Sequence, residues 1–119
     1  MSYVDGFVLP VPKKNLAAYR KVARAAGKVW RKHGALEYRE CIMDDPKNNW
    51  GGIPFIKLAG AKPGETVAFS FIVYKSRAHR DQVNARAGKD PFMNDPKYKL
   101  MPFDLKRQAY AGFKVIVEV

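Results

Sequence analysis

The chain has 119 residues, the length of a single domain built around one hydrophobic core. Hydrophobic residues make up 47% and charged residues 28%, a balance typical of a folded globular protein and not of a disordered one. The single cysteine, Cys41, excludes an internal disulfide, and no apolar stretch approaches the ~20 residues that span a bilayer. We therefore expect one domain over residues 1–119, located in the cytoplasm and without membrane contact.

The formal net charge is +11, and most of the excess lies in one segment. There is no acidic residue between Gly6 and Leu36. The same stretch carries eight cations, which are Lys13, Lys14, Arg20, Lys21, Arg24, Lys28, Arg31 and Lys32. A cluster of this kind is either a solvated surface or a contact for phosphate groups.

The first half of the chain reads as a strand, a helix and a second strand. Residues 3–11 are mostly apolar and are closed by Pro10 and Pro12, which predicts the strand. Residues 14–33 predict an amphipathic helix that ends before Gly34. The apolar positions of this helix recur at steps of three and four, at Leu16, Tyr19, Ala23, Ala26 and Trp30. Residues 35–44 alternate between apolar and polar side chains and predict the second strand.

The second half begins with a loop over residues 45–65, rich in Pro, Gly and Asn but containing apolar side chains such as Trp50 and Phe55. Residues 66–75 predict a third strand that is apolar on both faces. A helix over residues 77–87, capped by Ser76, follows. Residues 88–107 are irregular, and residues 109–119 predict a fourth strand.

The resulting order, βαββαβ, folds most simply as an α+β protein with a ferredoxin-like antiparallel sheet and both helices on one face. The third strand then occupies a central position. A central strand that is apolar on both sides needs a second cover, and the two helices provide only one. We therefore expect two chains to pack sheet against sheet as a homodimer, which makes a dimeric α/β barrel with the helices outside.

Four long stretches resemble the YbaA-like family of small bacterial proteins. They read YVDGFVLPVP, GKVWRKHGALEYRE, PGETVAFSFIVYKSRAHRDQVN and MPFDLKRQAYAGFK, and together they cover most of the chain. The resemblance implies the same ferredoxin-like dimeric α/β barrel. The family is one of unknown function, so the resemblance transfers no catalytic residue.

The segment SRAHRD holds one of the two histidines, His79, beside arginines and Asp81. Ser76 at the helix N-cap and Asp81 near the positive end of the helix dipole both fit a structural role. His79 is the alternative candidate for a pocket, because an imidazole exchanges protons near neutral pH. His33, in the last turn of the first helix, fits a structural role at the helix end.

Asp5 is unusual because aspartate is rare in the middle of a central strand. A buried carboxylate needs a partner, and the candidates are Lys114 on the last strand, a backbone amide or a ligand. Glu37 and Arg39 share one strand face, so they form an ion pair or converge on the same ligand. Asp5, Arg39, Tyr74 and His79 are therefore the candidate ligand-binding residues.

No spacing of His, Cys or carboxylates indicates a metal site, and no phosphate-binding loop or nucleophile elbow is present, so the sequence predicts neither metal nor cofactor. It assigns no catalytic residue. The leading hypothesis is a homodimer that holds a small, partly apolar ligand in a cavity of each protomer. The alternative is weak, salt-sensitive binding of RNA or DNA through the first helix. That surface would consist of Arg20, Lys21, Arg24, Lys28 and Arg31.

Overall fold

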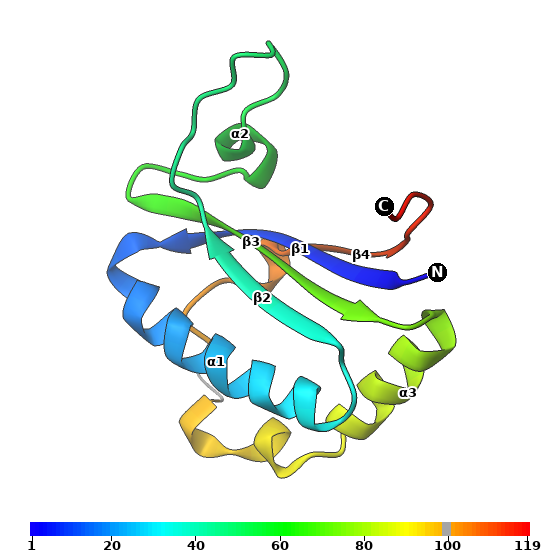
Figure 1. The fold of residues 1–119 in the computed structure, drawn as a ribbon. Coiled ribbons are helices and arrows are strands. Elements are labelled where there is room, and N and C mark those ends of the chain that lie inside the picture. Colours follow the sequence, from blue (N-terminus) through cyan, green and yellow to red (C-terminus); the bar gives the residue numbers. More distant parts are fainter. Residues whose placement is uncertain (99–100) are drawn as a thin grey trace.

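The computed structural model describes residues 1–98 and 101–119. Within them, four antiparallel strands form one sheet in the order β2-β3-β1-β4. The strands are β1 (Tyr3–Pro12), β2 (Glu37–Ile42), β3 (Glu65–Tyr74) and β4 (Ala109–Lys114). Helices α1 (Leu16–Lys32) and α3 (Arg77–Ala87) lie on the same face of the sheet (Figure 1). The predicted ferredoxin-like order and the placement of both helices are confirmed.

The strand register decides which side chains face the helices. Phe7 pairs with Ser70 and Leu9 with Ala68, so odd-numbered residues of β1 and even-numbered residues of β3 share the helix-covered face. The core lies there, and its buried members include Leu9, Val11, Tyr19, Ala68, Ile72, Tyr74 and Val83. The sheet is thus closed on one side by side chains from α1 and α3.

Helix α1 follows the predicted period. Tyr19, Ala23 and Gly27 are buried at intervals of four residues, while the charged side chains between them are exposed. The helix ends before Gly34, whose φ of 117° lies in the left-handed region that favours glycine. In α3, the Ser76 hydroxyl accepts a hydrogen bond from the backbone N–H of His79, so the predicted cap is confirmed.

The structure differs from the predicted elements in two places. The segment expected to be a loop over residues 45–65 contains a short helix, α2 (Phe55–Ala59), which ends at Gly60 in the left-handed conformation. The last strand stops at Lys114 instead of continuing to the C-terminus. Elsewhere the irregular segments contain 3-10 turns at Lys13–Asn15, Pro91–Asn94, Pro96–Tyr98 and Leu105–Arg107.

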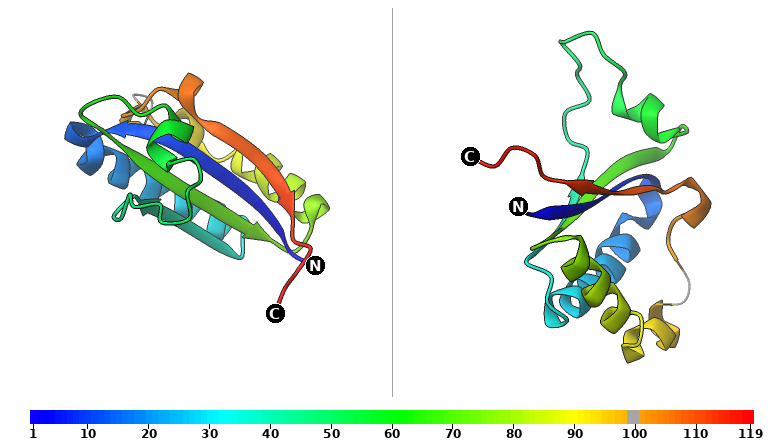
Figure 2. Two further views of the ribbon diagram at one scale, coloured as in Figure 1. Left: turned by 90° about the horizontal axis from the view of Figure 1, so that it is seen from above. Right: turned by 90° about the vertical axis from the view of Figure 1, so that its right-hand side faces the viewer.

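The face of the sheet turned away from α1 and α3, called here the open face, remains partly exposed. Phe69 on β3 and Phe113 on β4 keep 44% and 56% of their surface accessible. Helix α2 and the C-terminal segment stand on this side of the sheet (Figure 2). The Phe55 ring packs edge-on against Phe69 with centroids 6.3 Å apart, so α2 covers one end of the open face.

Candidate ligand-binding site

A cavity of about 230 Å³ lies between the sheet and α1. Its apolar wall comes from α1, at Val22, Ala23, Ala26 and Trp30, and from the sheet, at Phe7 and Ile72. The remaining side is closed by the segment after α3, through Phe92, Met93, Met101 and Phe103. The small alanine side chains of α1 leave this space where larger residues would fill it.

The segment that closes the cavity is anchored to the end of α1 by a buried carboxylate. Asp90 accepts hydrogen bonds from the ring Nε2 of His33 at 2.8 Å and from the backbone N–H of Phe92 at 2.9 Å. Lys32 adds an ion pair at 3.6 Å. The Phe92 amide and the His33 ring together lower the pKa of Asp90. His33 therefore has the structural role that its position predicts, with a specific partner 57 residues away.

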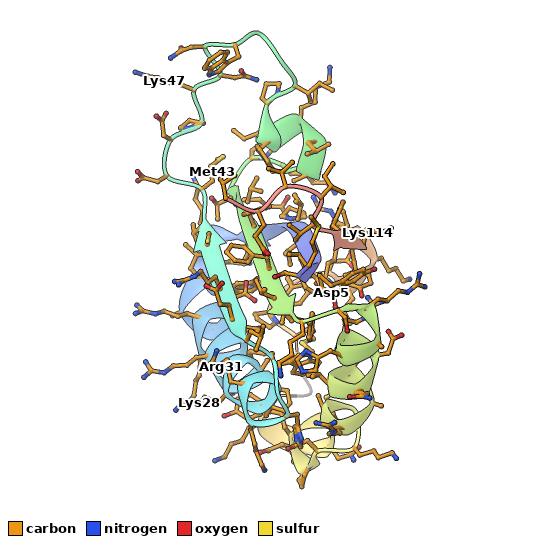
Figure 3. The ribbon with its side chains drawn as sticks, turned by 45° about the vertical axis from the view of Figure 1, so that its right-hand side comes forward. Asp5, Lys28, Arg31, Met43, Lys47 and Lys114 are labelled. Atoms are coloured by element: carbon orange, nitrogen blue, oxygen red, sulfur yellow. The ribbon has the colours of Figure 1, made fainter. Side chains whose placement is uncertain are left out.

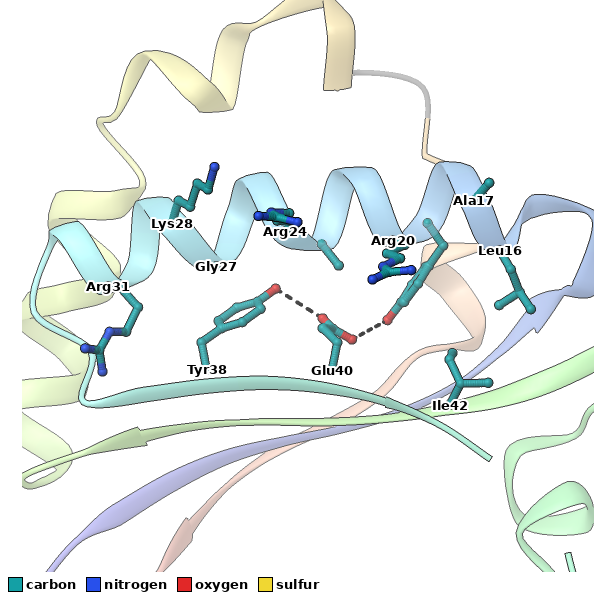
Figure 4. Close-up of a pocket in the computed structure, with 12 residues that line it drawn as sticks. Leu16, Ala17, Arg20, Arg24, Gly27, Lys28, Arg31, Tyr38, Glu40 and Ile42 are labelled. Carbon is teal, nitrogen blue, oxygen red and sulfur yellow. Dashed lines mark hydrogen bonds between the residues drawn. The ribbon is translucent and has the colours of Figure 1, made fainter. Parts of the chain in front are cut away.

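Two tyrosines and a glutamate form a bridge between α1 and β2, called here the Tyr-Glu-Tyr bridge. The hydroxyls of Tyr19 and Tyr38 donate to the two carboxylate oxygens of Glu40, at 2.6 and 3.1 Å (Figure 4). Burial, and then the negative charge of Glu40, raise the pKa of both phenols. Both tyrosines therefore stay protonated and remain hydrogen-bond donors at physiological pH. The bridge supplies part of the polar lining of the cavity, together with Arg39, Ser70 and Gln108.

On the other side of this bridge, a groove of about 1130 Å³ lies between α1 and β2, and we call it the basic groove. Arg20, Arg24, Lys28 and Arg31 line it from α1 (Figure 4). Lys28 and Arg31 lie in the C-terminal half of α1 (Figure 3), and Arg31 reaches the backbone carbonyl of Leu36, directly before β2. Lys21, the fifth residue of the predicted basic surface, does not line the groove. The periodic charges of α1 thus form a defined concave surface with most of the predicted residues.

Trp30 connects the cavity to a second polar cluster under α3. Its indole N–H donates to the Asn84 side-chain oxygen at 3.0 Å, and the Tyr74 hydroxyl donates to the same oxygen at 3.3 Å. Burial and the nearby Asp5 carboxylate raise the pKa of Tyr74. Tyr74 and Asp5, two of the candidate ligand-binding residues, therefore lie close together. Neither lines the cavity.

Asp5 is buried, with 2% of its surface accessible, and its partner is Arg80. One guanidinium nitrogen donates to Asp5 at 2.7 Å and to the Tyr110 hydroxyl at 2.9 Å. The guanidinium also stacks over the Tyr3 ring, 5.0 Å from its centroid. Lys114, the partner suggested by the sequence, forms no ion pair with Asp5. It is exposed and lies opposite Tyr3 in the strand register. The buried charge is therefore neutralised within the protein.

The two remaining candidates occupy different places. The ring Nδ1 of His79 accepts from the backbone N–H of Lys75 at 3.0 Å, which ties the start of α3 to the end of β3. Arg39 borders the cavity on β2, but its guanidinium pairs with Glu37 at 3.2 Å. The mutual ion pair expected as one alternative for these two residues is present. The four candidates do not converge on one point.

Sequence reasoning missed the residues that shape the cavity and its edge. The helical period predicts Tyr19 only as an apolar, core-facing position, and the period of β2 alone does not single out Tyr38 or Glu40 as a site. A signal was present, because Tyr38 and Glu40 alternate along β2 and so share the face that meets the helix. A glutamate on that face needs a hydrogen-bond donor from α1, which Tyr19 supplies.

The fold and these features define a ferredoxin-like α+β protein with a small cavity between its sheet and first helix. Over residues 2–105 the chain matches the family described as a protein of unknown function, DUF1428. It is 39% identical over 119 residues to the uncharacterised protein YbaA of Escherichia coli K12 and to that of Shigella flexneri, with 99% of both chains covered in each case. The chain therefore belongs to this YbaA-like family.

A solved structure supports the fold independently. The structure of Rv0793 from Mycobacterium tuberculosis superposes with a TM-score of 0.53 at 14% sequence identity, and the match covers 99% of this chain and 98% of that one. Within the described residues, every helix is too short or too polar to cross a bilayer. The cytoplasmic location stays a prediction.

Proposed function

We propose that the protein is a homodimeric binding protein that holds a small, partly apolar ligand in the cavity of each protomer. The observation that carries the proposal is the composition of the cavity wall. Apolar side chains from the sheet, α1 and the segment after α3 supply most of the lining. The polar groups are few: the Tyr-Glu-Tyr bridge, Arg39, Ser70 and Gln108. A mostly apolar cavity with a few placed polar groups is typical of small-molecule sites.

The open face supports the homodimer. Phe69, Phe71 and Phe113 lie on it, and monomeric soluble proteins rarely leave a contiguous apolar surface of this kind uncovered. A second copy packed sheet against sheet would bury these rings. The cavity lies on the opposite, helix-covered side of the sheet, because residues of α1 line it, so each protomer would keep its own ligand.

Native mass spectrometry of the protein, isolated from its own cells and washed at high salt, tests the proposal. The expected result is a dimer mass with a discrete small-molecule adduct. Ala26→Phe, which fills the cavity from α1, should remove the adduct while the dimer persists. Ala18→Phe is the matched control, because Ala18 is exposed on the same helix. An adduct that survives Ala26→Phe would show that the ligand binds elsewhere.

A nucleic-acid contact through α1 is the second candidate, favoured by one observation. Among the described residues, no carboxylate lies within ion-pair distance of Arg20, Arg24 or Lys28. Unpaired cations along a helix suit a phosphate backbone. Reversing these charges should flatten the dependence of RNA affinity on salt, and an unchanged slope would remove α1 from consideration. Tyr19 and Trp30 line the cavity, so neither offers a stacking platform beside the charges.

A further inference from the structure

The cations of the basic groove are available to a ligand. Arg31 donates to the backbone carbonyl of Leu36, whereas Arg20, Arg24 and Lys28 have no ion-pair partner in the described part of the chain. Neighbouring members of this set are four positions apart, which separates their Cα atoms by about 6 Å along the helix axis, so the set spans about 12 Å from Arg20 to Lys28. They therefore present a row of positive charge along one wall of the groove.

The groove contains a carboxylate, Glu40, but within the described residues it forms no ion pair with the cations of the groove. Both of its oxygens accept from phenol hydroxyls instead, one from Tyr19 and one from Tyr38. The lining therefore carries four cations against one carboxylate, and the carboxylate is already satisfied by neutral donors. An excess of positive charge in a concave surface attracts an anion, and arginine binds phosphate with particular geometric fit.

The basic groove and the cavity share a wall. Tyr19, Ala23, Tyr38 and Glu40 line both spaces, and the Tyr-Glu-Tyr bridge stands at their boundary. At about 230 Å³ the cavity is smaller than the ~300–1,000 Å³ of most ligand sites, whereas the groove is much larger. A ligand that occupies both spaces must pass beside the Tyr-Glu-Tyr bridge, and it would place an apolar part in the cavity and a polar part among the cations.

We propose that the ligand is a small amphiphile that ends in a phosphate or another multiply charged anionic group. Its apolar part occupies the cavity, and its anionic group lies in the basic groove against Arg20, Arg24 and Lys28. Three cations suit a multiply charged group better than a single carboxylate, which would leave most of the row unpaired. This inference rests on the proposed function, because it assigns a chemical class to the ligand of the same cavity.

Titration calorimetry with simple probes tests the inference. Butyl, hexyl and octyl phosphate carry both parts, the corresponding alcohols carry the apolar part alone, and inorganic phosphate carries the anion alone. At least one alkyl phosphate should bind about tenfold more tightly than its alcohol, the gain expected from charge-assisted hydrogen bonds. It should also bind more tightly than inorganic phosphate, because phosphate alone leaves the cavity empty.

Two sets of variants separate the contributions. Replacing Arg20, Arg24 and Lys28 with Gln should reduce alkyl phosphate affinity to that of the alcohol and leave alcohol binding unchanged. The matched control replaces Lys21, Lys75 and Lys89 with Gln, which removes the same charge from exposed positions outside both spaces. It should retain the preference for the phosphate. Circular dichroism melting curves confirm that each variant is folded before it is titrated.

The possible failures are distinguishable. If the alcohols bind as tightly as the phosphates, the proposal that the cavity binds a ligand is supported, but the inference that the ligand has an anionic group is wrong. If neither series binds while the native protein carries an adduct that Ala26→Phe removes, the inference is overturned and the proposed function stands; if there is no such adduct either, both are overturned. If the wild-type protein binds a single-stranded RNA oligonucleotide that alkyl phosphates fail to displace, and the groove variant loses that binding, the groove serves a nucleic acid and the inference is wrong.

Discussion

The pairing of Asp5 with Arg80 is the most buried charge interaction described in the protein. Their side chains keep 2% and 12% of their surface exposed, and the two residues are 75 positions apart in sequence. Arg80 also reaches Tyr110, so one guanidinium joins α3 to β1 and β4. The segment SRAHRD is therefore explained by a helix cap and a buried ion pair.

Removing Arg80 should be strongly destabilising. In Arg80→Gln the Asp5 carboxylate stays in an apolar layer without its cation, which costs about 3–5 kcal/mol of unfolding free energy. Arg39→Gln is the matched control, since it breaks an exposed pair with Glu37 and should cost less than about 1 kcal/mol. Urea denaturation of both variants measures the difference, and equal losses would contradict a dominant role for the buried pair.

Glu65 gives the stability of the protein an acid-sensitive component. Hydrogen bonds from Arg107 and from the backbone N–H of Lys62 lower the pKa of Glu65 from 4.5 to about 2. Because the pKa is lower in the folded state, this stabilisation is complete above about pH 4.5 and is lost as the pH falls toward about 2. Arg107→Gln should therefore be less stable than the wild type at neutral pH.

The difference between Arg107→Gln and the wild type should shrink over the same acidic range. Urea midpoints measured from pH 7 down to about pH 2 provide the test. A difference that stays constant to the acid limit would mean that Arg107 acts through its bond to the Gly60 carbonyl, at 2.7 Å, and not through Glu65.

At the scale of elements, the packing of α1 on β2 depends on a glycine. A Cβ at Gly27 would lie 2.7 Å from the Tyr38 ring, and the hydroxyl of that ring is held by Glu40. Alanine normally stabilises a helix by about 1 kcal/mol relative to glycine. Here the clash with a fixed ring should outweigh that gain, so Gly27→Ala should lower the free energy of unfolding by about 1–3 kcal/mol.

A second variant separates the clash from helix propensity. In a Tyr38→Leu background the ring is absent, so the same Gly27→Ala change should become neutral or stabilising. Thermal and urea denaturation of the two single variants and the double variant complete the cycle. Gly27→Ala that stabilises the wild-type chain would show that Tyr38 moves freely, which is incompatible with a fixed bridge to Glu40.

The elements that the sequence predicts well are those whose signal is local. The period of α1 and the Ser76 cap of α3 identify both helices from neighbouring residues. The early end of β4 is set by the length of the neighbouring strand β1. Lys114 pairs with Tyr3, the first residue of β1, so residues 115–119 extend past the start of that strand. The five-residue helix α2 is too short to show a helical period between Pro54 and Gly60.

The candidate site shows the same division between local and distant information. The basic stripe of α1 is readable in the sequence, because it depends on helical spacing alone. The cavity depends on the distance at which α1 docks on the sheet over the small side chains of Ala23 and Ala26, which the sequence does not specify. The Arg80 partner of Asp5 depends on where α3 docks, which the sequence does not specify, whereas Lys114 follows as a candidate from the expected strand order alone.

For the whole molecule, the open face is where assembly can be tested. Phe69 and Phe113 come from β3 and β4 and remain about half exposed, at 44% and 56%. Replacing both with Glu would place two like-charged patches opposite each other in a face-to-face homodimer. The desolvation and repulsion of these charges should shift the protein to monomers.

Sedimentation equilibrium of the double variant provides the measurement. Leu105→Glu is the control, because Leu105 is as exposed, at 56%, but belongs to the segment before β4 and not to the sheet. The control should remain dimeric. Since the cavity lies on the helix side, monomers of the double variant should still bind the best alkyl phosphate probe. A double variant that keeps the wild-type mass would exclude the open face as the dimer interface, whereas a wild-type monomer would refute the homodimer itself.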